Sequence, residues 1–564
     1  MTRRFLSLLL ALCLLLLSGC GKGASEPAAA GPGTFGAGSE EETSAAESEE
    51  AAPLRTTGSF AMPCNAAYGW DPFSCVGMEN RAVMELLYEG LFCLNNQFEA
   101  EPVLCESWTV SDDGRTYTLD LRKASFSSGK ELSSDDVLYS MEKAEESELY
   151  GGRFDDVASY YASGYTSVVI ELYRPNDRLP CLLNFPIVPA FSPTENPLGT
   201  GPFVRTMDFL SVNPQWWRGA EHIHFQTISL YSSASSEDTR DNFEIDSVHL
   251  VYNNPNASTA ATYHCDYELW NSRGTVIQYI GFNFGYGIFQ DRTLRAAVTH
   301  AIDRVGIAES VYHNFADPAV LPVAPSSTMY DEELAEQFAF TSAKAAMEEL
   351  KTSEYFDLPA GYDPSGRVPK VIVGTTGMAE ESQDEDYDDY DGEDGETEAV
   401  PSPTPSAAAS YNKITMLVRG GNVHRVAAAR QAAQHLTDVG FTVTLREVDA
   451  EDFYYALNNT EWDLYYGEVT LQPDFDLRPL LSMDGSITYG SYGGSGELED
   501  LLSGMRENSG NSYDVFQYVM ERGYLCPVLF VNNAVFTTRG VFTGLDPSPD
   551  NVFYNLDNVY VNHN

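Results

Sequence analysis

The second half of the chain contains a strand–helix–strand pattern. Residues 413–418 (KITMLV) read as a strand, residues 423–440 place apolar residues at helical spacing and end at a glycine, and residues 441–448 (FTVTLREV) alternate as a second strand. Two strands joined by one helix over this distance form a βαβ unit, whose strands run parallel in one sheet. The sequence therefore predicts an α/β fold.

The rest of the chain mixes helix and strand patterns in the same way. Residues 80–91 (NRAVMELLYEGL) place apolar side chains near one helical face, and residues 116–121 alternate as a strand. Residues 133–142 begin with serines and acids, as helices do, and residues 291–312 predict one long helix. About 510 residues follow the N-terminal segments, which is enough for two or three domains with a sizeable core.

The N-terminus has the pattern of a bacterial secretory signal. Arg3 and Arg4 precede an apolar run that is too short to span a membrane, and Leu17-Ser18-Gly19-Cys20 follows. Small residues before a cysteine suit lipoprotein signal peptidase, and the cysteine thiol receives diacylglycerol. We expect residues 1–19 to be a lipoprotein signal peptide and Cys20 to be the lipid attachment residue, on the outer face of the cell membrane.

Residues 20–53 are expected to form a lipidated flexible tether. They consist mainly of Gly, Ala, Ser and Glu with almost no large apolar residue, so burial cannot offset the entropy lost on ordering. No later segment reaches about 18 consecutive apolar residues, so the lipid is the expected means of membrane attachment.

Acidic residues dominate the chain, with 83 acids against 33 bases and a formal net charge of −50. Such a charge repels phosphates and anionic head groups, so nucleic acid is not an expected partner. The acids concentrate in residues 380–398, which hold twelve acids and no base. We expect a disordered acidic insertion at about residues 379–410. A calcium loop is the alternative, but the segment lacks the ligand spacing that such a loop needs.

The cysteines do not indicate a metal site. Seven of the nine follow Cys20, and they show neither CxxC nor His-Cys spacing. Cys64 with Cys75, or Cys93 with Cys105, are close enough in sequence for disulfides in an exported protein. Buried free thiols are the other interpretation, and the sequence leaves both open.

Common catalytic motifs are missing from the sequence. It holds no G-x-S-x-G elbow, HExxH, Walker loop or dinucleotide fingerprint, and residues 281–285 lack the GxGxxG order. We therefore expect no enzymatic activity, no cofactor and no metal.

Several segments match one known family in order and spacing. Residues 86–142 contain LYEGL, P-x-L-x-x-S-W, S-D-D-G-x-T-Y-T, L-R-x-x-x-F-x-x-G and D-V-x-x-S. GTGPF at 199–203, IGFNF at 280–284 and WDLYYGEVTLQPDFD at 462–476 follow. Together they resemble the bacterial extracellular solute-binding proteins of family 5, the oligopeptide- and dipeptide-binding receptors of ABC importers, over nearly all of residues 55–540.

The resemblance implies an α/β, two-lobe clamp like the periplasmic binding proteins of class II, which closes around a solute. The hinge strands would lie near residues 279–283 and 489–494. The implied division is lobe I at 54–278, with an extra subdomain at about 80–175, lobe II at 279–490, and a C-terminal segment at 491–564 that returns to lobe I.

The implied solute site departs from the family pattern. Peptide binders of the family often carry a Trp and then an Asp that pairs with the peptide ammonium group, and here these positions hold Val469 and Gln472. A shift of two residues would bring in Asp474, and Glu468 lies on the same face of its strand as Tyr466. Core packing or helix capping are the alternative roles, and a solute without a free amine is another possibility. The candidate ligand-binding residues are Tyr279, Phe282, Asn283, Tyr286, Tyr466, Glu468 and Asp474.

Export, tether and clamp together predict a monomeric substrate-binding lipoprotein of an ABC transporter. It would capture peptides or similar small solutes between its lobes and deliver them to the membrane permease. The alternatives are a receptor for a metal chelate or an oligosaccharide, and a surface signalling or adhesion protein that retains the clamp.

Overall fold

The computed structural model describes residues 58–562, apart from 194, 286, 341, 354–371, 376–411, 460 and 490–494. The expected signal peptide, Cys20, the tether, the acidic insertion and Tyr286 therefore lie outside the described residues. No helix among the described residues has both the length and the apolar character to cross a membrane.

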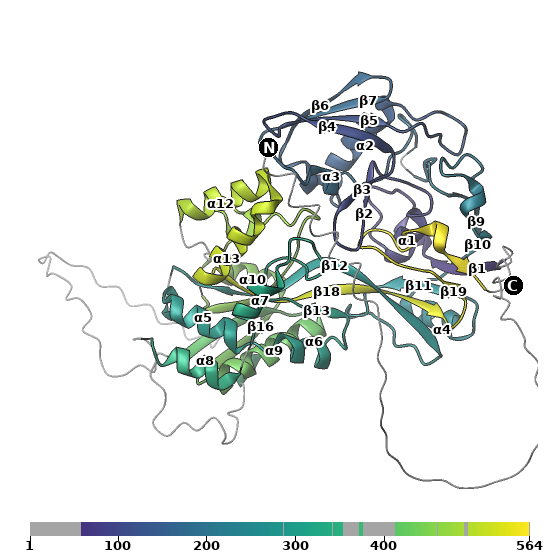
Figure 1. Ribbon diagram of the computed structural model, residues 1–564. Coiled ribbons are helices and arrows are strands. Elements are labelled where there is room, and N and C mark those ends of the chain that lie inside the picture. The colour runs from purple at the N-terminus through teal and green to yellow at the C-terminus, as the bar shows by residue number, and fades with distance from the viewer. Residues whose placement is uncertain are drawn as a thin grey trace, which may run out of the picture. The chain divides into compact units, whose positions relative to one another are not determined.

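The first hydrophobic core lies in the N-terminal half and takes in the last residues of the chain. It fully buries Val83, Leu104, Phe225 and Val559. A four-stranded sheet beside it has the order β1-β10-β9-β8, with β1 and β10 parallel. We call the part of the molecule around this core lobe I (Figure 1). Its elements outside the subdomain described below are β1 (Gly58–Cys64), α1 (Met78–Met84), β2 (Phe92–Leu94), β3 (Ala100–Pro102), α3 (Leu179–Leu182), β8 (Phe203–Arg205), β9 (Phe209–Val212), β10 (Phe225–Ser232), α4 (Ser236–Glu244), β11 (Leu250–Asn253), β19 (Phe542–Thr543) and β20 (Tyr560–Val561).

The two described ends of the chain meet in lobe I. Gly58, the first residue of β1, lies so close to Val561 of β20 that a side chain at position 58 would collide with it. The imidazole of His224 stacks on the Tyr560 ring with centroids 4.1 Å apart. The C-terminal strand therefore packs beside the N-terminal one.

A second sheet forms a subdomain of lobe I at the top of Figure 1. Its four strands are antiparallel in the order β4-β5-β7-β6. In the second of these strands Tyr117, Leu119 and Leu121 are buried and alternate with less buried residues, as expected for a strand with one face in the core. Ser133 and Asp136 cap the helix that packs on the sheet. The elements are β4 (Cys105–Val110), β5 (Thr116–Leu121), α2 (Ser134–Glu145), β6 (Val157–Gly164) and β7 (Ser167–Leu172).

The remaining strands form the largest sheet, in the order β11-β18-β12-β17-β15-β16-β14, with β13 also paired to β18. The predicted βαβ unit is present in it, because residues 413–419 and 442–448 pair in parallel and are joined by a helix. Two further cores lie against this part of the sheet, and one of them also takes in Leu94, Phe98 and Cys181 of lobe I. We call the rest of the part around these two cores lobe II. Its strands are β13 (Ala316–Pro318), β14 (Ile372–Thr375), β15 (Lys413–Arg419), β16 (Thr442–Val448) and β17 (Leu464–Thr470).

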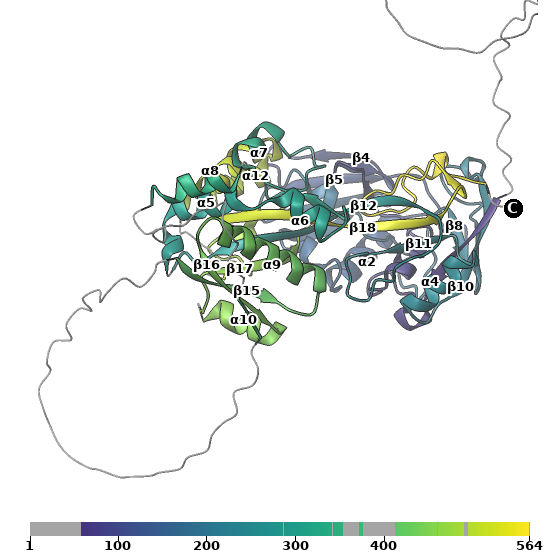
Figure 2. The same cartoon turned by 90° about the horizontal axis from the view of Figure 1, so that it is seen from below.

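Helices cover lobe II, and Figure 2 shows α9 lying along the strands of the βαβ unit. Its Ala428, Ala429, Ala432 and Ala433 are fully buried, so helix and sheet approach closely. The helices are α5 (Arg292–Ala301), α6 (Arg304–Ser310), α7 (Glu332–Phe338), α8 (Ala343–Leu350), α9 (Val423–Asp438), α10 (Ala450–Asn458), α11 (Arg478–Leu481), α12 (Gly496–Glu507) and α13 (Ser512–Arg522).

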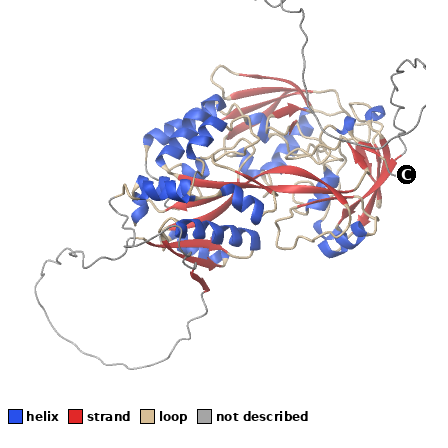
Figure 3. Ribbon diagram, turned by 60° about the horizontal axis from the view of Figure 1, so that its bottom comes forward, coloured by secondary structure: helices blue, strands red, loops and turns tan. Residues whose placement is uncertain are grey.

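Two long antiparallel strands belong to both lobes and appear as the long red arrows across Figure 3. They are β12 (Tyr267–Phe282) and β18 (Leu525–Thr538), paired from Tyr267–Thr538 to Gly281–Leu525. Val535 contributes to the core of lobe I, whereas Leu529 and Ile280 contribute to a core of lobe II. The register shifts between Ser272 and Val276, which is a local irregularity between the two ends.

The second connecting strand, expected near residues 489–494, lies almost entirely outside the described residues and stays a prediction. The two helices that follow, α12 and α13, belong to lobe II. Their apolar faces, with Leu498, Leu502, Val515 and Val519 buried, pack in a core of lobe II. The chain re-enters lobe I only along β18, because these helices have an apolar stripe to bury before the strand begins.

The single helix predicted from Asp291 is two helices. Ile302 takes an extended conformation, and Asp303 caps α6 by accepting a hydrogen bond from the Gly306 amide at 2.9 Å. Buried Arg304 donates to the carbonyls of Thr299 at 3.1 Å and Ile302 at 3.2 Å. The guanidinium therefore satisfies carbonyls that the helix break would otherwise leave without donors.

The seven described cysteines are free thiols. Neither pair that is close in sequence forms a disulfide in this structure. Burial raises the pKa of the Cys105 thiol to about 12, so it stays protonated and acts as a small apolar side chain.

Candidate functional site

Three parallel strands of lobe II end at one edge of the sheet. β15 pairs in parallel with both β16 and β17, so their carboxyl ends lie on the same side. In open α/β sheets this edge is the usual place for a ligand. β15 ends there with Arg419, and α9 begins after the cap residue Asn422.

The exposed end of β17 has an unpaired edge. On one side, Leu464–Thr470 pairs with Phe282–Val276 of β12. On the other side, the ladder with β15 covers only Leu464–Tyr466. Within the described residues, no strand pairs with this second edge from Gly467 to Thr470. Its backbone groups can therefore pair with an extended chain from outside the protein.

Three adjoining pockets surround this strand end. Their volumes, which include open solvent, are about 600, 560 and 500 Å³. Val469 lines all three, Arg419 lines the first and third, and Thr470 lines the first and second. The first pocket also touches Asn254 and Asn256 of lobe I, so it lies between the lobes. Together the three pockets form the candidate site.

The Glu468 carboxylate is held by neighbours inside the protein. Arg425 of α9 is 5% exposed and donates to it at 2.7 Å, and the Gln278 amide donates to its other oxygen at 2.6 Å. The Gln278 carbonyl oxygen accepts hydrogen bonds from the hydroxyls of Tyr312 and Tyr466 at 2.8 and 2.9 Å. Glu468 and Arg425 therefore form a hydrogen-bonded ion pair without net charge, and this pair forms one wall of the third pocket.

Arg419 is the available cation beside that wall. It donates to the Tyr454 hydroxyl at 3.2 Å and forms no ion pair with any described residue. The amino end of α9, which carries a partial positive charge, begins four residues later. This part of the site therefore favours an anionic group on a solute.

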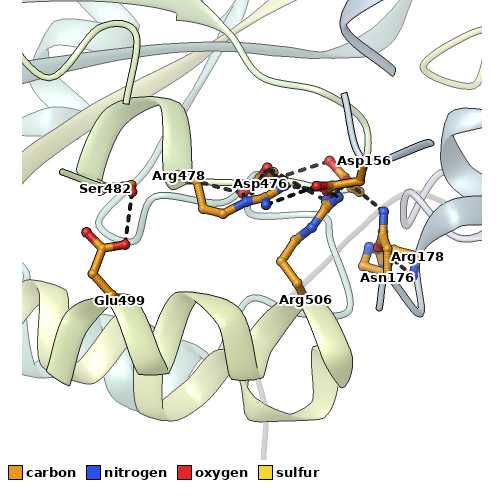
Figure 4. A network of polar contacts seen from close by, with 9 residues as sticks. Asp156, Asn176, Arg178, Asp476, Arg478, Ser482, Glu499 and Arg506 are labelled. Carbon is orange, nitrogen blue, oxygen red and sulfur yellow. Dashed lines mark hydrogen bonds and ion pairs between the residues drawn. The ribbon is translucent and has the colours of Figure 1, made fainter. Parts of the chain in front are cut away.

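The second pocket is bordered by an ion cluster that joins the lobes (Figure 4). Asp156 of the lobe I subdomain binds Arg478 through two contacts of 3.2 and 2.5 Å and also pairs with Arg506 of α12. Arg506 pairs with Asp474 and Arg478 with Asp476, the latter at 2.7 Å.

These opposite charges control the ionisation of Asp156. Burial raises the pKa of this carboxyl, but hydrogen bonds from Arg478 and the charges of both arginines outweigh burial and leave the pKa below its usual range. Asp156 is therefore an anion in the closed contact, and five charged side chains hold the two lobes together.

Aromatic side chains also meet between the lobes beside the cluster. Phe98 of lobe I and Phe475 of lobe II contact edge to face with ring centroids 5.0 Å apart. Both have left-handed backbones, with φ of 60° and 55°, which non-glycine residues rarely adopt. Both side chains are fully buried, so this contact adds an apolar interaction between the lobes.

The family can be assigned from a comparison with family models. The model for "Bacterial extracellular solute-binding proteins, family 5 Middle" matches residues 99–487, which is most of the described chain. The chain belongs to this family. Family 5 proteins are binding proteins with a two-lobe clamp, and the lobes and shared strands described above have this arrangement.

Family 5 relatives differ considerably in sequence from this chain. The glutathione-binding protein GsiB of Escherichia coli strain K12 is 26% identical over an alignment of 278 residues, and the alignment covers 45% of this chain and 54% of GsiB. The chain thus matches about half the length of that relative.

Two solved structures of similar proteins share the fold. The oligopeptide-binding protein AppA of Bacillus subtilis, in complex with a nonapeptide, is 18% identical with a TM-score of 0.55, covering 90% of this chain and 99% of AppA. The ABC transporter substrate-binding protein CtaP of Listeria monocytogenes is 16% identical with a TM-score of 0.62, at the same coverage.

Four of the candidate ligand-binding residues of this family 5 protein line the pockets. Tyr279, Tyr466 and Glu468 line the third pocket, and Glu468 also lines the first. Asp474 lines the second but is bound by Arg506 and by the Asn176 amide at 3.3 Å. Each of the two carboxylates expected to meet a ligand ammonium group therefore has an arginine partner in the protein.

The other candidates lie elsewhere. Phe282 and Asn283 are fully buried at the end of β12, where the Asn283 amide donates to the Trp462 carbonyl at 2.8 Å. They connect the strand to the chain before β17, and Tyr286 is not described. Sequence reasoning missed Arg419, Arg425 and Asp156. The position of Arg419 directly after the predicted strand 413–418 was the one available signal, because parallel strands place their last residues at the ligand edge.

Proposed function

We propose that this chain is the substrate-binding protein of an ABC importer and that it captures a peptide or a similar small solute between its lobes. The unpaired edge of β17 from Gly467 to Thr470 carries the proposal. An extended peptide gains main-chain hydrogen bonds there, while its side chains enter the three surrounding pockets. Such binding is tolerant of side-chain identity, as a nutrient receptor requires.

Arg419 is proposed to bind the carboxylate of the solute. It has a single described hydrogen-bond partner, a hydroxyl, and it lines two of the three pockets. The carboxylates of Glu468 and Asp474 are bound by arginines, so an ammonium group must compete with a guanidinium for either of them. We therefore expect the anionic end of the solute to contribute more to affinity than the cationic end.

The proposed place of action is the outer face of the cell membrane. Cys20 carries the lipid in this proposal, residues 20–53 form the tether, and the loaded clamp delivers its solute to a membrane permease as a monomer. The chain performs no chemistry on the solute. Incubation with a peptide mixture should leave every peptide intact by mass spectrometry.

The test begins with the solute itself. Native mass spectrometry of the purified protein should show a bound peptide or small acid, because a clamp tends to retain its cargo. Calorimetry then compares that solute with a version whose carboxylate is amidated, using the unaltered protein and two variants. Arg419→Gln should weaken binding of the free acid about tenfold or more, and of the amide far less.

Arg430→Gln on α9 is the matched control. Arg430 is half exposed and faces Glu447 at 3.9 Å, away from the pockets, so its loss should leave the affinity unchanged. The proposal is contradicted if no peptide or small acid binds, or if the two variants lose affinity equally.

A further inference from the structure

A separate cavity lies inside lobe I. It occupies about 1170 Å³, counting its open mouth, and is lined by α1, β2, the short helix at 151–154, and the loops at 184–186, 216–218 and 550–556. No residue of β12, β17 or lobe II lines it. Arg153 alone lines both this cavity and the second pocket of the β17 site. A cavity of this size can hold a small organic molecule.

The carboxylates that line the cavity already have hydrogen-bond donors. Glu89 accepts from the indole N–H of Trp216 at 3.0 Å and of Trp217 at 3.1 Å. Asp550 accepts from the Asn184 amide at 2.7 Å, from the Ser548 hydroxyl at 3.0 Å and from the Leu94 amide. These donors are all neutral and belong to the protein.

The remaining two acids behave in the same way. Glu85 accepts from the Val552 amide at 2.7 Å, and Glu101 accepts from the Tyr554 hydroxyl at 2.9 Å. Burial raises the pKa of Glu85 to about 8, so it is mainly protonated at neutral pH. Each of the four acids therefore has at least one hydrogen-bond donor from the protein.

The guanidinium groups of the cavity are only partly satisfied: one terminal nitrogen of Arg153 donates to the Leu182 carbonyl at 3.4 Å and to the Asn184 side-chain oxygen. Arg81, Arg153 and Arg218 line it, and none of the three forms an ion pair with a described residue. The Nε atoms of Arg153 and Arg218 are buried without a hydrogen-bond partner. A buried N–H donor without an acceptor is costly, and an arginine fork fits a carboxylate. Burial also lowers the pKa of Arg153, which a bound anion would reverse.

Aromatic rings supply the remaining walls. Phe92, Tyr150, Trp216, Phe553 and Tyr554 line the cavity beside the arginines. Flat apolar surfaces next to cationic donors suit an organic acid with a carbon skeleton better than a bare inorganic ion.

We propose that this cavity is a second binding site, for a small organic carboxylate held by Arg153 and Arg218. All residues that line the site belong to lobe I, and Arg153 is the one residue that it shares with the second pocket of the β17 site. Lobe I can then bind a small organic acid in this cavity while the β17 site binds the transported solute.

Calorimetry with glutarate on the full chain tests the proposal. Glutaramide, which has the same skeleton without charge, is the first control ligand, and inorganic phosphate is the second. We expect glutarate to bind, glutaramide not to bind and phosphate to bind at least tenfold more weakly than glutarate. Arg218→Gln should weaken glutarate binding at least tenfold, and Arg430→Gln, which changes an arginine outside the cavity and the three pockets, should leave it unchanged.

Hydrogen exchange on the unaltered chain locates the bound glutarate without the use of a variant. Glutarate should protect the amides of residues 150–153 and 216–218 but not those of 467–470. Absence of glutarate binding, equal binding of glutaramide, phosphate binding as tight as that of glutarate, or protection at 467–470 instead would each overturn the proposal.

Discussion

At the scale of single residues, the GTGPF motif has a steric explanation. Gly199 and Gly201 lie against the backbone of Leu86 and Leu87, and the Gly201 amide donates to the Leu87 carbonyl at 3.0 Å. A methyl group at position 199 would overlap that carbonyl, which belongs to backbone and cannot rotate away. Gly199→Ala should lower the free energy of unfolding by about 3 kcal/mol. Denaturant unfolding measures it, and Gly496→Ala, where a methyl group meets open space, should change it little.

Glu85 makes the stability of the protein depend on pH. Its pKa is raised from 4.5 to about 8 by burial, so between these values the unfolded chain releases a proton that the folded chain keeps. The free energy of unfolding should therefore fall as pH rises through this window, by at most about 1.4 kcal/mol per pH unit. Glu85→Gln should remove this contribution to the decrease in the free energy of unfolding. Urea titrations at pH 5.5 and 7.5 measure the difference.

The control for Glu85 is Glu106→Gln, the same change at an exposed position of β4. It should leave the pH dependence as it is in the unaltered protein. Parallel pH dependence in the Glu85→Gln variant and the unaltered protein would contradict the explanation.

At the scale of elements, one ion pair attaches α9 to β17 and another attaches it to β16. Arg425 and Glu468 are 5% and 21% exposed and 2.7 Å apart, whereas Arg430 and Glu447 are 48% and 35% exposed and 3.9 Å apart. Glu468→Gln leaves a buried guanidinium without its counter-charge and should cost about 3 kcal/mol. Glu447→Gln should cost less than about 1 kcal/mol. Equal losses in thermal unfolding would show that burial does not distinguish the two pairs.

At the scale of the whole molecule, Asp156 connects the lobes. Asp156 is the carboxylate through which lobe I joins the ion cluster, whereas Arg478 and Arg506 also have aspartate partners within lobe II. Asp156→Asn therefore removes the attraction between the lobes and should shift the unliganded clamp toward open forms. A loss of about 1.4 kcal/mol in the closed contact raises the ratio of open to closed molecules tenfold. Small-angle X-ray scattering should then give a larger radius of gyration. Asp155→Asn is the exposed neighbouring control, and an unchanged radius in Asp156→Asn would exclude this role.

Anchoring is tested on the same scale. If Cys20 carries the lipid, Cys20→Ala should move the full chain from the membrane fraction to the soluble fraction of the expressing cell. Ser18→Ala keeps a small residue at the cleavage site and should stay with the membrane. Membrane association of the Cys20→Ala variant would remove the lipid anchor from the proposal.

The sequence predicted the elements that local patterns define and missed the features that distant residues create. The βαβ unit at 413–448 and the capped helix at 134–145 are present because periodicity and caps act within one segment. The break at Ile302 depends on Arg304, whose carbonyl partners include Ala319 and Pro527, far along the chain. The strand β18 connects the two lobes because it pairs with β12, which lies more than 200 residues away in the sequence. No local sequence pattern predicts that pairing.

The contact between Gly58 and Val561 has a consequence for how the protein would work on a surface. If Cys20 is anchored, the tether leads directly into lobe I. Lobe I then stays close to the membrane, and lobe II is the lobe that moves when the clamp opens and closes. Fluorescent dyes near the two described ends of the chain, at β1 and β20, would then report nothing about the motion of lobe II, because both strands belong to lobe I. A dye pair that follows closure needs one partner on lobe II, for example at Met483, which is 65% exposed.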